Sequence, residues 1–133
     1  MKKSMQRVLA VLSVAAVLFS LTTAFAAQPP IDHPNWTYIE DAECYCYVSG
    51  GTVYAEGYVQ GDSRVTKSQI TLTIQRQSGS SWVNVTSDTN LEYDNYAELD
   101  LTASAISGAT YRAKASVKVW YSSGTESTTV TSN

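Results

Sequence analysis

From residue 36 to residue 133 the sequence contains no proline, and apolar and polar side chains alternate along much of this stretch. The three prolines of the chain all come earlier, at Pro29, Pro30 and Pro34. A two-residue period places apolar side chains on one face of an extended strand, and sheet ladders need the backbone N–H that proline lacks. Because Thr, Val, Ser and Tyr are also abundant, residues 37–133 are predicted to form one all-β domain.

The clearest turn signal is the Gly50-Gly51 pair, which lies between two alternating runs. Glycine readily adopts the positive φ angles of two-residue hairpin turns, so residues 43–60 are predicted to form a hairpin. The register that this turn implies places Tyr47 opposite Tyr54. The inner face of the hairpin would then carry small apolar side chains, and its outer face would carry aromatic and acidic ones.

Further turn signals separate about five more alternating runs between residues 67 and 131, whose inward positions are expected to build the core. These positions are Ile70, Leu72, Ile74, Ala97, Leu99, Leu101, Tyr111, Ala113, Ala115, Val117 and Val119. The polar stretch 87–95 is expected to be a loop. Trp82 and Val85 are both expected to be buried, but they are three residues apart, so a regular strand would place them on opposite faces. A β-bulge between them would bring both side chains to the same face. About seven short strands of this kind are typical of an antiparallel β-sandwich.

The first 26 residues have the pattern of a secretory signal peptide. Three basic residues precede an apolar run over 8–21, and the small-residue pattern Ala24-Phe25-Ala26 follows. Such a helical leader is cleaved after the last alanine, and the run is shorter than the roughly 20 residues of a membrane-spanning helix. We therefore expect a secreted, extracellular protein in which residues 27–36 form an extended Pro-rich linker. A leader retained as an N-terminal anchor is the alternative.

The charge of the chain restricts its partners. The formal net charge is −3 at pH 7, from 9 basic and 12 acidic residues. Removal of the leader, which holds three of the basic residues and none of the acidic ones, would make the chain more negative. A strongly acidic protein is a poor electrostatic partner for nucleic acid or for an anionic membrane. We therefore expect no nucleic-acid partner, and no membrane partner once the leader is removed.

A turn that ends at Gly108 precedes Tyr111 and Arg112 at the start of an expected strand. This arrangement resembles the entry to the sixth strand of immunoglobulin-like and fibronectin-type-III-like domains, where a tyrosine hydroxyl folds back onto the preceding turn. The inter-sheet cysteine pair of antibody domains is absent, because Ala113 stands two residues after the tyrosine. The resemblance implies an immunoglobulin-like sandwich in which the first, second and fifth strands share one sheet and the third and sixth share the other.

The order of segments over residues 38–130 is also similar to that of a group of small secreted proteins of Gram-positive bacteria. The shared segments are the leader, the Gly50-Gly51 hairpin, the runs 70–76 and 79–82, and the turn before Tyr111. These features are structural. The resemblance therefore implies secretion and a β-sandwich fold, and it implies no activity.

Cys44 and Cys46 are the only cysteines, and they lie two residues apart on an expected strand. Their Cβ atoms would be about 6–7 Å apart, whereas a disulfide needs about 3.8 Å, so they are not expected to bond to each other. Two thiolates could contribute to a metal or redox site, but the single histidine, His33, lies in the linker. We expect two reduced thiols in the core, with a metal site or an intermolecular bond as the alternatives.

Four tyrosines would share the outer face of the first hairpin, and they are the candidate binding residues: Tyr45, Tyr47, Tyr54 and Tyr58. Aromatic side chains on a flat sheet can stack on sugar rings or anchor a protein partner. The alternative is that cross-strand tyrosine pairs only stabilise the hairpin.

No motif of an enzyme active site is present in the sequence. The G-x-S-x-G, G-x-G-x-x-G and phosphate-loop patterns are missing, and His33 is the sole imidazole. Carboxylates cluster between residues 88 and 100, but without the loop glycine of a calcium site. The cluster is expected to be solvated. No cofactor is expected, and the protein is not expected to be an enzyme.

Together these features favour a secreted, non-catalytic β-sandwich module that binds a surface glycan or a protein. A small structural envelope protein that self-associates is the alternative, and a small hydrolase is the least favoured. The sandwich is expected to be electrically two-sided. The tyrosine side would carry Glu43, Glu56, Glu98 and Asp100, and the opposite side would carry Lys67, Arg112, Lys114, Lys118 and Trp120.

Overall fold

A computed structural model of the protein describes residues 35–133. The expected leader (1–26) and most of the expected linker (27–36) lie outside the described residues, so both stay predictions. Across residues 35–133 the chain forms strands and connecting turns, with no helix that is long and apolar enough to cross a membrane.

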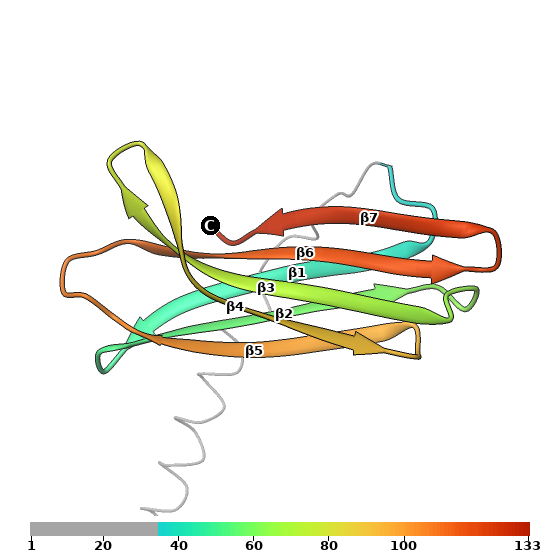
Figure 1. The fold of residues 1–133 in the computed structure, drawn as a ribbon, viewed down its shortest axis with the longest axis horizontal. Coiled ribbons are helices and arrows are strands. Elements are labelled where there is room, and N and C mark those ends of the chain that lie inside the picture. The colour runs from blue at the N-terminus through green and yellow to red at the C-terminus, as the bar shows by residue number, and fades with distance from the viewer. Residues whose placement is uncertain (1–34) are drawn as a thin grey trace, which may run out of the picture. The chain divides into compact units, whose positions relative to one another are not determined.

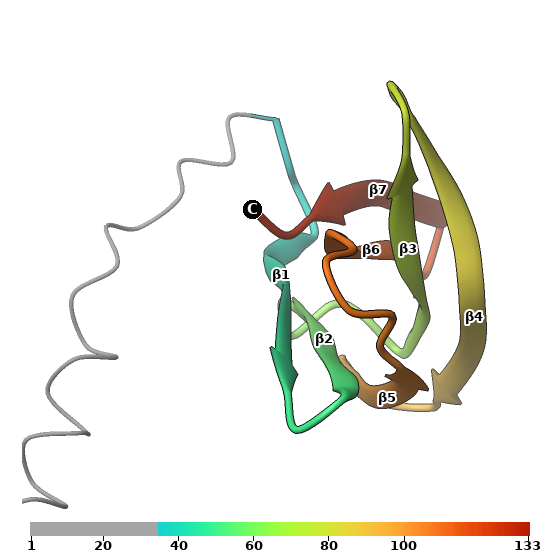
Figure 2. The same cartoon turned by 90° about the vertical axis from the view of Figure 1, so that its left-hand side faces the viewer.

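The described residues form seven strands in two antiparallel sheets that face each other (Figures 1 and 2). The strands are β1 (Ile39–Ser49), β2 (Thr52–Gly61), β3 (Lys67–Ser78), β4 (Ser81–Glu92), β5 (Tyr96–Ser104), β6 (Tyr111–Tyr121) and β7 (Gly124–Thr131). One sheet has the order β1-β2-β5 and the other the order β4-β3-β6-β7. The predicted all-β sandwich is thereby confirmed, and the strands are divided between the sheets as expected.

The hairpin that joins β1 and β2 has the register predicted from its turn. Tyr47 lies opposite Tyr54, and the turn residues Gly50 and Gly51 have φ angles of 57° and 79°. Residues with side chains rarely adopt such angles, so the glycine pair fixes where the chain reverses. This turn therefore determines which side chains of both strands share a face.

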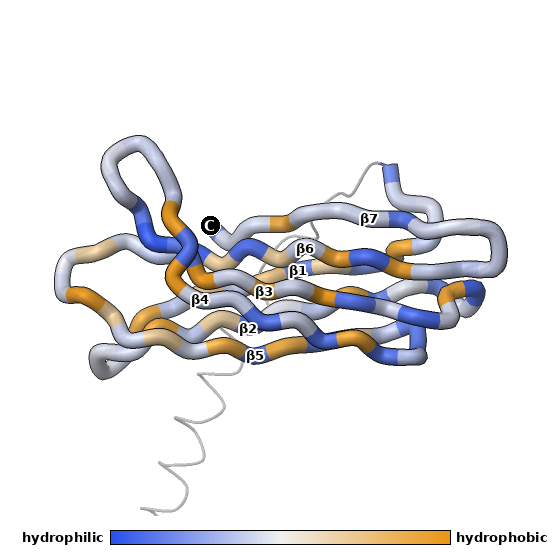
Figure 3. The backbone as a smooth tube through the Cα atoms, in the orientation of Figure 1, coloured by the Kyte–Doolittle hydropathy of each residue, from blue (hydrophilic) through white to orange (hydrophobic). Residues whose placement is uncertain are grey.

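The core lies between the two sheets and consists of small and branched aliphatic side chains. Its fully buried large side chains are Ile70, Leu72, Ile74, Val53, Val59 and Val119. Hydrophobic and hydrophilic residues alternate along β3 and β6, the two central strands of the four-stranded sheet (Figure 3). This alternation sends the polar side chains of both strands to the outer face of that sheet.

The expectation of a loop over residues 87–95 is wrong for most of that stretch, because β4 continues to Glu92. Thr89 pairs with Thr71 of β3 through their hydroxyls at 2.8 Å, and Ser87 pairs with Thr73 at 2.9 Å. Since β4 is an edge strand, solvent reaches most of its side chains, and the sequence there has no apolar alternation that would indicate a strand.

The expected bulge is present, but the side chains that suggested it are not buried. Ile74 pairs with Thr86 and Gln75 pairs with Asn84, so Val85 is the extra residue of β4. Val85 is 37% exposed because the β3–β4 hairpin projects away from the sheets (Figure 1). Trp82 is half-buried, on the outer face of the sheet, where the guanidinium of Arg112 lies 4.2 Å from the centroid of its ring.

The turn before β6 has the contact implied by the resemblance. The hydroxyl of Tyr111 accepts a hydrogen bond from the backbone N–H of Ile106 at 2.8 Å. At the other end of the sandwich, Tyr38 stacks on Tyr121 with ring centroids 3.6 Å apart, and the guanidinium of Arg64 lies 4.4 Å from the Tyr38 ring centroid. These contacts tie the chain before β1 and the chain before β6 to the sandwich.

Candidate binding site

The outward-facing residues of β1, β2 and β5 form one continuous surface, which we call the tyrosine face. The register of the three strands places its larger side chains in successive rows. These side chains are Asp41, Glu43, Tyr45, Tyr47, Tyr54, Glu56, Tyr58, Tyr96, Glu98 and Asp100. The four candidate tyrosines of the sequence therefore do lie on one face, together with carboxylates from three strands.

Two of these tyrosines form a stacked pair near the β1–β2 turn. The rings of Tyr47 and Tyr54 are 5.0 Å apart between centroids and 12° from parallel. Tyr47 is 52% exposed, whereas Tyr54 is half-buried between its neighbours. A stacked pair of this kind presents a rigid apolar surface, with few rotatable bonds to immobilise when a ligand packs on it.

The other two candidate tyrosines are held by carboxylates of β1. Tyr58 donates its hydroxyl hydrogen to Asp41 at 2.6 Å, and Tyr45 donates to Glu43. The hydrogen bond to Glu43, together with burial and the charge of Glu43, raises the pKa of Tyr45 to about 12. Burial, and then the hydrogen bond to Asp41, also raise the pKa of Tyr58. Both phenols therefore remain neutral hydrogen-bond donors at physiological pH and are not nucleophiles.

The sequence analysis missed Tyr96, which extends the tyrosine face onto β5. Its ring stacks on Tyr58 with centroids 6.1 Å apart, and its hydroxyl donates to Glu98 at 2.8 Å. Its position two residues before Glu98 is the signal that could have found it, because residues i and i+2 of a strand share a face. The signal is weak because the polar stretch 87–95, which is expected to be a loop, ends next to Tyr96.

The centre of the tyrosine face holds an unfavourable pair. Glu56 of β2 and Asp100 of β5 are directly opposite each other, and like charges in this position are destabilising. No lysine or arginine occupies an outward position of β1, β2 or β5. The face therefore attracts cationic groups and repels phosphates.

The opposite side of the sandwich, the outer face of β4, β3, β6 and β7, has the reverse charge. We call it the lysine face, and its large side chains are Lys67, Arg112, Lys114, Lys118, Trp120 and Trp82. The ammonium groups of Lys67 and Lys118 lie 4.1 Å and 5.1 Å from the ring centroid of Trp120. Because cations cover this ring, it is less available than the tyrosine pair for stacking on a sugar.

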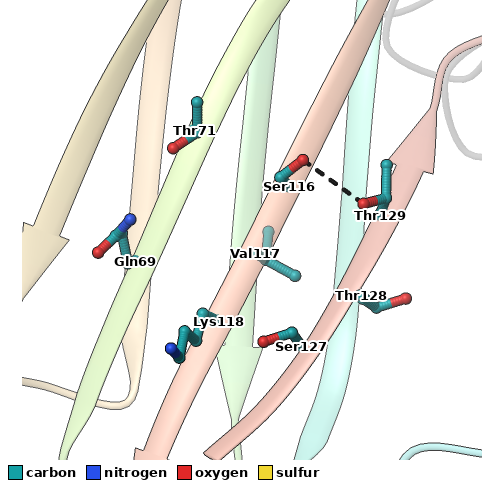
Figure 4. Close-up of a pocket in the computed structure, with 8 residues that line it drawn as sticks. All are labelled: Gln69, Thr71, Ser116, Val117, Lys118, Ser127, Thr128 and Thr129. Atoms are coloured by element: carbon teal, nitrogen blue, oxygen red, sulfur yellow. Dashed lines mark hydrogen bonds between the residues drawn. The ribbon is translucent and has the colours of Figure 1, made fainter.

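A shallow groove of about 390 Å³ crosses the lysine face between β3, β6 and β7 (Figure 4). Its polar lining includes Gln69, Ser116, Lys118 and Thr129, and the hydroxyls of Ser116 and Thr129 are 3.4 Å apart. The groove is lined mainly by hydroxyl and amide groups. These groups can form weak, exchangeable hydrogen bonds.

The two cysteines differ in their surroundings. Cys44 is buried, and its thiol lies 3.5 Å from the carbonyl oxygens of Ala113 and Val130. Cys46 is only half-buried, so the expectation of two core thiols is correct for Cys44 and too strong for Cys46. Both thiols are free, and no group of three or more His, Cys, Asp or Glu side chains within residues 35–133 is placed to hold a metal ion.

Comparisons with known proteins identify no family for this chain. No family model matches it, and neither does any curated protein. The solution structure of CsgH from R. palustris is 16% identical over 67% of this chain and 88% of its own, with a TM-score of 0.40. The crystal structure of Spo0M, a sporulation control protein from Bacillus subtilis, is 8% identical over 74% of this chain and 50% of its own, with a TM-score of 0.33. Likenesses this distant carry no argument about function.

Proposed function

We propose that this protein is a secreted, non-catalytic binding module of the immunoglobulin-like, fibronectin-type-III-like kind. The strand order β1-β2-β5 against β4-β3-β6-β7 and the hydrogen bond from Ile106 to the Tyr111 hydroxyl support the assignment to this kind of sandwich. The pattern of the leader and the resemblance to small secreted Gram-positive proteins support secretion. The site residues are those of the tyrosine face, and Tyr47 and Tyr54 lie at its most exposed end.

One observation carries the proposal: the exposed Tyr47 stacks on the half-buried Tyr54 on a face that holds carboxylates and no cation. An exposed aromatic surface beside hydrogen-bond acceptors suits the apolar face and the hydroxyl groups of a neutral sugar. It also suits a basic segment of a surface protein. The ligand class is therefore a neutral surface glycan or a cationic protein surface, and the tyrosine face repels phosphate-rich polymers.

The test is a pull-down of the protein on whole cells and on isolated wall material. Replacing Tyr47 and Tyr54 together with serine should reduce binding at least about tenfold, which corresponds to the loss of one aromatic anchor. Tyr93→Ser is the matched control, because Tyr93 is 82% exposed and lies outside the tyrosine face. Unchanged binding by the double variant, with the fold intact by circular dichroism, would overturn the proposal.

Secretion is tested separately. Mass spectrometry of protein recovered from the culture medium should give a chain that begins at Ala27, because cleavage is expected after Ala26. A chain that keeps residues 1–26 and is found in the membrane fraction rather than in the medium would support the alternative of a retained anchor.

A further inference from the structure

We propose that the protein self-associates head to tail, with the lysine face of one copy on the tyrosine face of the next. This inference goes beyond the proposed function and concerns the same tyrosine face. A second copy would cover Tyr47 and Tyr54, so self-association would regulate access to the binding site. The two proposals share the tyrosine face but depend on different residues, because ligand binding depends on Tyr47 and Tyr54 whereas self-association depends on the carboxylates and the lysines.

The first argument is complete charge segregation between the two outer faces. The tyrosine face carries Asp41, Glu43, Glu56, Glu98 and Asp100 and no basic residue. The lysine face carries Lys67, Arg112, Lys114 and Lys118, and no acidic residue occupies an outward position of its four strands. Each face therefore repels another copy of itself and attracts the opposite face of a second copy.

The second argument is the spacing of the charges. The carboxylates occupy three successive outward rows, which begin at Asp41 and end at Asp100, and these rows span about 13 Å at the usual rise of a strand. Lys114 and Lys118 lie four residues apart on β6, which also corresponds to about 13 Å. A lysine can thus reach each end of the acidic rows while both sheets stay flat against each other.

The third argument is the unfavourable pair of Glu56 and Asp100. These side chains are opposite each other near the middle of the face. No lysine or arginine occupies an outward position of β2 or β5, the strands that carry them. A lysine from a second copy would relieve their repulsion, because opposite charges across an interface offset like charges within it. This stabilisation is gained only in the associated state.

The size of the faces sets the strength of the contact. Three strands of about ten residues cover about 500 Å² per copy, or about 1,000 Å² for the pair of faces. This lies at the low end for specific interfaces, so the association should be weak and reversible. Because the two faces in contact are different, the contact does not close on itself, and dimers, trimers and longer series should form as concentration rises.

The first experiment is sedimentation equilibrium of the protein as it is recovered from a secreting host. At low salt the weight-average mass should rise continuously as the protein approaches about 1 mM, and about 0.5 M salt should abolish the rise by screening. A single monomer mass at all concentrations in low salt would overturn the proposal. So would association that salt leaves unchanged, since that would not depend on the charged faces.

The second experiment uses two charge-reversed variants. One carries Glu56→Lys with Asp100→Lys, and the other carries Lys114→Glu with Lys118→Glu. Each variant alone should sediment as a monomer. An equal mixture should associate again and should extend beyond dimers in alternating order, because the unchanged lysine face of the first variant fits the unchanged tyrosine face of the second, and the two reversed faces are again of opposite charge. A mixture that stays monomeric would overturn the proposal.

A control variant separates the effect of the faces from that of net charge. Asp88 and Glu92 are exposed on β4, and their register with Leu72 and Ser68 places them off the outer faces. Asp88→Lys with Glu92→Lys should associate as the parent does.

Pull-downs with all variants distinguish the failure of one proposal from the failure of the other. If only Tyr47→Ser/Tyr54→Ser loses wall binding, the result says nothing against self-association. If the parent protein is a monomer at all concentrations, self-association is overturned and the proposed binding function is unaffected.

Discussion

Glu126 of β7 accepts a hydrogen bond from the backbone N–H of Ile39, the first residue of β1, at 2.7 Å. The same carboxylate accepts hydrogen bonds from the N–H groups of Tyr38 at 3.0 Å and of Thr37 at 3.0 Å. One side chain therefore satisfies three successive donors where the chain enters the sandwich. It joins the edge strands of the two sheets at a point where no ladder connects them.

Replacing Glu126 with glutamine should lower the free energy of unfolding by about 1–3 kcal/mol at pH 7, because three hydrogen bonds to a charged acceptor are weakened. Burial alone would raise the pKa of Glu126, but the three backbone donors outweigh it and lower the pKa. A lowered pKa means that the stabilisation is complete above the ordinary value of 4.5 and is lost as pH falls through the folded value.

Denaturant unfolding at pH 7 and pH 3 measures this difference. The gap between parent and Glu126→Gln should be clear at pH 7 and should shrink at pH 3. Glu92→Gln, which changes an exposed carboxylate at the end of β4, is the control and should have little effect. An equal gap at both pH values would contradict the role of the ionised carboxylate.

Gly61 should not tolerate alanine, because an added Cβ would lie 2.6 Å from Cγ2 of Val65. Val65 is buried, so neither group can move without disturbing the core, and Gly61→Ala should cost about 1–3 kcal/mol. The clash disappears when Val65 is shortened. Gly61→Ala should therefore cost less in a Val65→Ala background than in the parent, and a double-mutant cycle from urea unfolding measures the coupling. Additive effects would show that the close approach is not the cause.

Tyr111→Phe should lower the free energy of unfolding by about 1 kcal/mol, since it removes the hydroxyl that accepts the N–H of Ile106. The effect is moderate because water can replace part of the lost bond at this exposed turn. Tyr93→Phe removes an equivalent hydroxyl from an exposed ring and serves as the matched control. Equal stability of the two variants by thermal unfolding would mean that the turn does not depend on this bond.

The two thiols should react with a maleimide at different rates. Burial raises the pKa of Cys44 to about 11, so only about one thiol in a thousand is ionised at pH 8, and the side chain is covered as well. Burial also raises the pKa of Cys46, but this side chain is half-exposed. Mass spectrometry at early times should show one label, on Cys46. Cys46→Ser should stay unlabelled until denaturant is added, and rapid labelling of that variant would place Cys44 outside the core.

Local patterns in the sequence were sufficient to predict the faces of most strands. The Gly50-Gly51 turn fixed the register of Tyr47 with Tyr54, and alternation placed Ile70 and Leu72 inside. Both predictions depend only on neighbouring residues, because a strand has a period of two and a two-residue turn leaves one register. For the same reason the four candidate tyrosines were correctly placed on one face.

The sequence by itself determined that this chain forms a β-sandwich with an acidic, aromatic side and a basic side, because side-chain parity is a local property. Only the tertiary structure decided which strands are edges and where the core ends. The length of β4, the exposure of Val85 and the addition of Tyr96 to the tyrosine face all follow from those two facts. The contact of Glu126 with Ile39 spans 87 residues of sequence, and no local period encodes a pairing at that distance.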